Sequence, residues 1–147
     1  MSPRHVERQW NQFTGALQTA LTREEVARSY LDSVGHVIHA PALGHYELSE
    51  DGAMVDVRAT VTGEMLQEYE EYGREDDPVL SFVAQHQRPI DSSRVVSPEV
   101  WEACGARNAL GTAGYGHSLE APIIVSGLLF GTINFARPAK ERAFDNA

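Results

Sequence analysis

The chain has 147 residues, a net charge of −9 and a single cysteine, Cys104. Its length suits one domain with a hydrophobic core, 1–147, and its mean hydropathy of −0.32 is typical of a soluble globular protein. Such an acidic chain lacks the basic surface that direct nucleic-acid binding requires. One cysteine excludes an internal disulfide and a zinc cluster built from cysteines, so we interpret Cys104 as a small structural residue.

Neither a membrane span nor a secretory signal is predicted. The apolar runs are shorter than the roughly 18 to 20 residues of a membrane helix. The N-terminus, "MSPRHVERQWNQF", has no apolar signal-peptide core. We therefore expect a cytoplasmic protein without membrane contact, and any role in gene control would need a separate DNA-binding domain.

An amphipathic helix is predicted over residues 3–21. Its apolar residues form one narrow stripe at helical spacing: Val6, Trp10, Phe13, Leu17 and Ala20. Side chains as large as Trp10 and Phe13 must pack against something. Packing on the domain and formation of a dimer both remain open for this helix.

Capping residues and strand alternation define the elements that follow. Thr22 and Glu25 form a capping box that begins a second helix, and Gly35 is placed to end it. Residues 36–61 are predicted to be two strands joined by a turn at residues 50–52, because apolar and polar residues alternate in the second strand.

The middle of the chain is predicted to be mostly helical. Residues 63–73 form one helix, and Asp77 is the N-cap of the next. A short extended segment follows, and Ser97 then caps a short helix that ends at Gly105. The three glycines of residues 111–116 indicate a loop.

Residues 117–137, "HSLEAPIIVSGLLFGTINFAR", predict a β-hairpin with a Ser-Gly turn. On its first arm, Glu120 and Ile124 face one way, and Leu119, Ala121, Ile123 and Val125 face the other. Both faces are largely apolar, which is typical of strands in the middle of a sheet. Gly131 indicates close approach by another group. The order of elements predicts an α+β fold, an antiparallel sheet with helices on both faces.

The hairpin resembles the closing signature of GAF domains, on the stretch "LEAPIIVSGLLFGTINFARP". The order of predicted elements is similar to the GAF and PAS plan over nearly the whole chain. In GAF domains a final helix normally follows the last strand, and here the sequence stops near Phe144, where that helix would begin. The resemblance thus implies that a C-terminal helix or output domain is missing from residues 1–147. In bacterial regulators such an output is often a LuxR-type helix-turn-helix.

A second stretch, "EYEEYGREDDPVLSFV", is similar to LuxR-type autoinducer-binding domains. In that family an aspartate before Pro-Val accepts a hydrogen bond from the amide of an acyl-homoserine lactone. The resemblance assigns this role to Asp77 and makes Tyr69 or Tyr72 pocket aromatics. The tryptophan that the family has upstream is replaced here by "TGEML".

These resemblances imply a small-molecule sensor domain of a bacterial LuxR-type transcriptional regulator, acting as a homodimer and reaching DNA only through a separate domain. The ligand would be small and apolar or amphipathic, with no metal or cofactor and no enzymatic activity. The expected ligand-binding residues are Tyr69, Tyr72, Asp77, Phe82, Trp101, Tyr115, His117 and Ile124. A GAF dimerisation module that binds no ligand and a haem or tetrapyrrole sensor remain as alternatives.

Overall fold

The computed structural model describes residues 2–144. The chain divides into two compact units, Met1–Pro41 and Ala42–Ala147. Within the described residues, no helix combines the length and hydrophobicity that a membrane span requires.

The first unit is a pair of helices followed by one short turn of helix. Helix α1 (Pro3–Gln18) ends three residues before the predicted boundary, and α2 (Arg23–Ser33) continues into η1 (Val34–His36). The rings of Phe13 and Tyr30 lie 6.1 Å apart and join the two helices. The predicted cap is confirmed at Thr22, because its hydroxyl accepts a hydrogen bond from the Glu25 amide at 3.1 Å. The Glu25 carboxylate accepts the amide of Leu21, one residue before the cap, at 2.7 Å.

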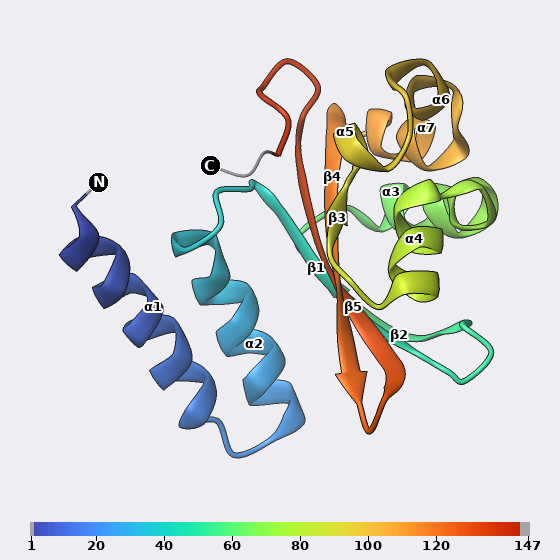
Figure 1. The fold of residues 1–147 in the computed structure, drawn as a ribbon. Helices are drawn as coiled ribbons and strands as arrows, with labels where there is room; N and C mark the ends of the chain where they lie inside the picture. Colours follow the sequence, from blue (N-terminus) through green and yellow to red (C-terminus); the bar gives the residue numbers. More distant parts are fainter. Residues whose placement is uncertain (1, 145–147) are drawn as a thin grey trace. The chain divides into compact units, whose positions relative to one another are not determined.

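The second unit is built on a five-stranded antiparallel sheet with the strand order β2-β1-β5-β4-β3 (Figure 1). Its strands are β1 (Ala42–Leu48), β2 (Met54–Ala59), β3 (Ile90–Asp91), β4 (Tyr115–Val125) and β5 (Leu128–Pro138). The prediction of an α+β fold with a GAF-like antiparallel sheet is therefore confirmed. The strand predicted from residue 36 begins only at Ala42.

The hairpin of β4 and β5 occupies the interior of the sheet only along part of its length. Ser126 and Gly127 form the turn with positive φ angles of 52° and 79°, as a tight hairpin turn requires. Strand β1 pairs with β5 only up to Gly131, so the hairpin continues beyond its neighbour. Ile124 and Leu128 at this end are accordingly exposed. The prediction that the whole hairpin lies in the middle of the sheet is therefore wrong for its tip.

Gly131 is the position where β5 passes closest to β1. A Cβ atom at this residue would lie 2.1 Å from the carbonyl oxygen of Tyr46, far inside contact distance. The group that the sequence predicted to approach Gly131 is therefore the backbone of the neighbouring strand.

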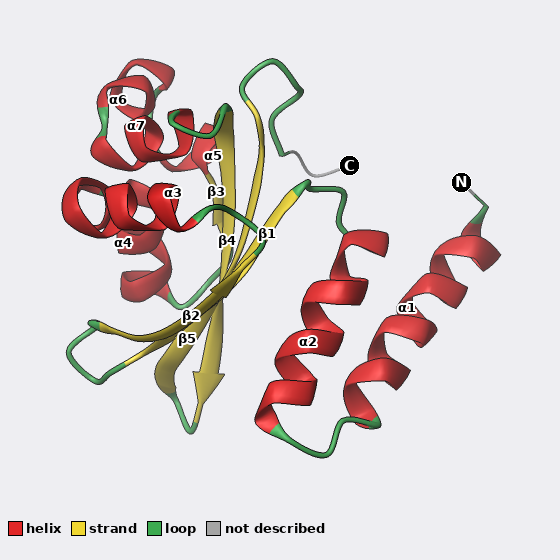
Figure 2. Ribbon diagram, turned by 180° about the vertical axis from the view of Figure 1, so that it is seen from behind, coloured by secondary structure: helices red, strands yellow, loops and turns green. Residues whose placement is uncertain are grey.

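Helices cover one face of this sheet, as two opposite views show (Figures 1 and 2). They are α3 (Gly63–Glu68), α4 (Pro78–His86), α5 (Ser92–Val95), α6 (Pro98–Ala103) and α7 (Gly105–Gly111). Between α3 and α4 the chain forms a π-helical turn, η2 (Tyr69–Gly73), and a 3-10 turn, η3 (Arg74–Asp76). The predicted single helix over residues 63–73 thus changes type halfway.

Two short helices, α5 and α7, were not predicted. Residues 92–95 were predicted to be extended but form α5, and Gly105, the predicted end of the last short helix, is where α7 begins. Tertiary contacts fix this start, because the Gly105 amide donates to the Asp76 carboxylate at 2.8 Å. The sulfur of Cys104 accepts the Arg107 amide at 3.4 Å and caps the helix.

Candidate ligand-binding site

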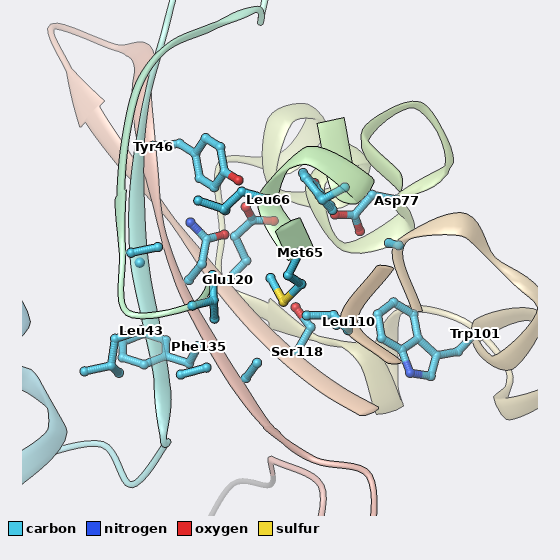
Figure 3. Close-up of a pocket in the computed structure, with 18 residues that line it drawn as sticks. Leu43, Tyr46, Met65, Leu66, Asp77, Trp101, Leu110, Ser118, Glu120 and Phe135 are labelled. Carbon is cyan, nitrogen blue, oxygen red and sulfur yellow. The ribbon is translucent and has the colours of Figure 1, made fainter. Parts of the chain in front are cut away.

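A cavity of about 80 Å³ lies between the sheet and the covering helices (Figure 3). Every residue that lines it belongs to the second unit. Four small residues on three strands form much of its floor: Ala42, Gly44, Ala59 and Ala136. Because such side chains do not reach the helices above, space remains between the two layers.

The roof of the cavity is apolar and aromatic. It is formed by Met65 and Leu66 of α3, Tyr69 of η2, Trp101 of α6 and Leu110 of α7. The buried Trp101 ring is fixed by a 2.9 Å hydrogen bond from its indole N–H to the Gly116 carbonyl. A wall of this kind suits an apolar ligand body, with the few polar groups setting its orientation.

Asp77 enters the cavity from the helical side, and both of its carboxylate oxygens are used. Oδ1 caps α4 by accepting the amides of Val79 at 2.9 Å and Leu80 at 3.2 Å. Oδ2 accepts the Tyr69 hydroxyl at 2.6 Å. Burial raises the pKa of Asp77, and these three hydrogen bonds oppose the shift by favouring the charged form.

Glu120 enters the same cavity from the floor, on β4 (Figure 3). It is only 4% exposed. Burial, reinforced by the negative charge of Asp77, raises the pKa of Glu120 to about 8, while the Thr132 hydroxyl and Arg74 oppose the shift. At neutral pH its carboxyl group is therefore largely protonated. Asn134, its partner in the β4–β5 register, adds an amide to the same cavity.

Arg74 supports the two tyrosines of the site. Its guanidinium group lies 5.0 Å from the ring centre of Tyr46 and 5.5 Å from that of Tyr69. The same group donates two hydrogen bonds to Glu70, at 2.7 and 2.8 Å, so its charge is already paired. Burial raises the pKa of Tyr46 and of Tyr69, and both phenols keep their protons at neutral pH.

The structure brings together three of the eight residues that the sequence predicted for the site. Tyr69, Asp77 and Trp101 line the cavity. Tyr72, three positions after Tyr69 in η2, is 65% exposed and does not line the cavity. The π-helical turn breaks the regular spacing that had placed both tyrosines on one face.

The other four predicted residues do not line the cavity. Phe82 packs on His86 of its own helix, with the ring centres 4.5 Å apart. Tyr115 and His117 stand at the start of β4, and a ring nitrogen of His117 hydrogen-bonds with the Glu141 carbonyl at 2.8 Å. Ile124 is at the exposed hairpin tip.

The prediction missed Tyr46, Ser118, Glu120 and Asn134, the polar and aromatic residues of the sheet side. A signal was present for Glu120, because its alternation in β4 placed it opposite to the apolar face of that strand. Tyr46 and Asn134 become neighbours of Glu120 only through the β1–β5 and β4–β5 registers, which sequence spacing does not reveal. Residues 2–144 contain no group of three His, Cys, Asp or Glu side chains able to hold a metal ion.

Replacing Asp77 separates its capping role from its charge. Asp77→Ala leaves three donors, all at least partly buried, without this acceptor, and we expect the free energy of unfolding to fall by about 2 kcal/mol. Asp77→Asn keeps an acceptor for the helix amides and should lose less than half of that. Urea unfolding of both variants measures the difference, and equal losses would contradict the capping role.

No protein-family model matches the sequence, and no curated protein matches it. Solved structures do match. The GAF domain of a phosphoenolpyruvate-protein phosphotransferase from Coxiella burnetii superposes with a TM-score of 0.62 at 16% identity, covering 94% of this chain and 80% of that one. The chain has a GAF fold.

Two further structures extend the comparison of this GAF fold. The N-acylhomoserine lactone dependent LuxR family transcription factor CepR2 from Burkholderia cenocepacia has a TM-score of 0.70 at 15% identity, covering 96% of this chain and 82% of that one. A phycoerythrobilin-bound GAF domain from a cyanobacterial phytochrome has a TM-score of 0.61 at 11% identity, covering 99% of this chain and 87% of that one. These similar structures are sensor and regulatory domains.

Proposed function

We propose that this GAF-fold chain is the small-molecule sensor domain of a bacterial LuxR-type transcriptional regulator. The observation that carries the proposal is the cavity between sheet and helices, apolar on its walls and supplied with a few buried polar groups. That combination is typical of sites that bind and orient small ligands. The similarity to CepR2 supports the regulator context.

In this proposal the ligand acts by shifting a conformational equilibrium, and the domain performs no chemical reaction. A ligand that enters the cavity must move the roof, because about 80 Å³ is far below the roughly 300 Å³ of a typical drug-sized site. The roof includes η2 and the cap of α4, so occupancy favours one packing of these elements. The protein would act in the cytoplasm as a homodimer and reach DNA through a separate helix-turn-helix domain.

The small cavity also favours a second candidate, a GAF dimerisation module whose interior is filled by its own side chains. A haem or tetrapyrrole is disfavoured by the same volume, and His117, the histidine predicted for the site, does not line the cavity. The two candidates differ in one respect, which is whether any small molecule stabilises the folded state.

Thermal unfolding of the chain with a metabolite panel that includes acyl-homoserine lactones decides between them. A ligand at about 100 times its Kd contributes about 2.7 kcal/mol, enough to raise the Tm by several degrees. Ala136→Val adds two methyl groups to the buried floor and should abolish the shift while the variant stays folded. Ala59→Val serves as a second filling variant. If no compound raises the Tm of the wild type by more than it raises the Tm of these variants, the sensor proposal fails.

A further inference from the structure

We propose, building on the sensor function above, that the cavity accepts a ligand whose polar group is a protonated nitrogen. Two carboxyl groups, Asp77 and Glu120, enter the cavity from opposite layers of the domain. The structure thus offers two acidic groups to whatever occupies the space between the layers (Figure 3).

The lining residues include no Lys, Arg or His. Arg74, the cation whose charge acts on Glu120, is paired with Glu70 through two short hydrogen bonds and is not a lining residue. An anionic ligand would therefore enter a low-dielectric space that already holds two carboxyl groups and has no cationic side chain in its lining.

The aromatic groups favour an organic cation over a metal ion. Tyr46, Tyr69 and Trp101 all contribute to the cavity wall. Their rings attract alkylammonium groups through cation–π interaction, whereas a metal ion needs several oxygen ligands. Together with the apolar roof, they suit a primary amine on a short hydrocarbon body.

The charged groups around Glu120 determine how such a ligand would bind. Asp77 and Tyr69 belong to the helical layer and Tyr46 to strand β1, and Arg74, paired with Glu70, contacts the rings of both tyrosines. Ionisation of Glu120 is costly because its carboxyl group is buried and shares the cavity with Asp77. An ammonium group close to both carboxyl groups removes that cost. Binding of the amine near neutral pH should therefore release roughly one proton from Glu120.

Three probes of equal chain length test the inference: n-butylammonium, 1-butanol and butyrate. Binding is followed by NMR titration of the folded chain, and proton release by calorimetry in two buffers with different ionisation enthalpies. We expect n-butylammonium to bind at least about tenfold more tightly than the alcohol, and butyrate to be weakest. In Glu120→Gln the preference for the amine and the proton release should both disappear. Glu64→Gln, on an exposed helix face, is the matched control and should behave as the wild type.

The outcomes separate this inference from the sensor function. If 1-butanol or butyrate binds at the cavity as tightly as the amine, a ligand site exists but the cationic class is overturned. If the amine binds without proton release, or Glu120→Gln retains the preference, the role of Glu120 is overturned. If none of the three probes shifts a cavity resonance, the inference fails, and the metabolite panel then decides the sensor function independently.

Discussion

Glu120→Gln is expected to stabilise the protein strongly at alkaline pH and to change little in acid. The wild-type carboxyl group is buried, and its pKa is raised to about 8 from the ordinary value of 4.5. Below about pH 4.5 the group is protonated in both the folded and the unfolded state, and it contributes no pH dependence there. Between the two pKa values the unfolded chain ionises first. The wild type therefore loses stability as pH rises, and the loss is complete above about pH 8.

Glutamine is neutral at every pH and nearly isosteric with the protonated acid. The free energy of unfolding of Glu120→Gln should thus lie within about 1 kcal/mol of the wild-type value near pH 5. Near pH 9 it should exceed the wild-type value by about 4 kcal/mol. Urea unfolding at three pH values measures it, with Glu64→Gln as the exposed control. A constant difference across this range would show that Glu120 ionises normally in the folded protein.

Gly131→Ala is expected to lower the free energy of unfolding by at least about 3 kcal/mol, above the usual range for overpacking. The added methyl group would lie 2.1 Å from the Tyr46 carbonyl oxygen and 3.2 Å from its carbon, which are backbone atoms and not the end of a flexible side chain. Strand β5 cannot move away from β1, because β4 is paired along its other edge.

The matched control for this variant is Gly63→Ala, at the start of α3. A Cβ atom there meets nothing within 4 Å, so this change should be neutral or slightly stabilising. Thermal unfolding should show a fall of roughly ten degrees for Gly131→Ala alone. A Tm close to that of the control would mean that β1 and β5 separate at this point without cost.

Local signals allowed the sequence to predict many of the elements. Thr22, Asp77 and Ser97 cap helices as expected, because each accepts an amide from the first turn that follows it. The hairpin was also predictable from a local signal, because the positive φ angles of its turn are set by two adjacent residues, Ser126 and Gly127.

Elements that depend on distant contacts were not predictable in this way. Helix α7 begins where Asp76 accepts the Gly105 amide, a contact between residues far apart in sequence. The π-helical turn η2 displaced Tyr72 from the cavity although it is near Tyr69 in sequence. The sheet side of the site depends on strand registers, and Glu120, Asn134 and Tyr46 come together only when β5 pairs with both neighbours.

The two layers of the cavity differ in how freely their residues can be exchanged over evolution or by design. Asp77 holds the first turn of α4, so a new side chain there reduces the amount of folded protein whatever the ligand. Ser118, Glu120 and Asn134 stand on strands whose ladder hydrogen bonds come from the backbone. Variation at these three positions leaves the backbone hydrogen bonds of the sheet in place. Relatives with this fold should therefore diversify their ligand preference from the sheet, and a library built to retune the site should vary the sheet residues first.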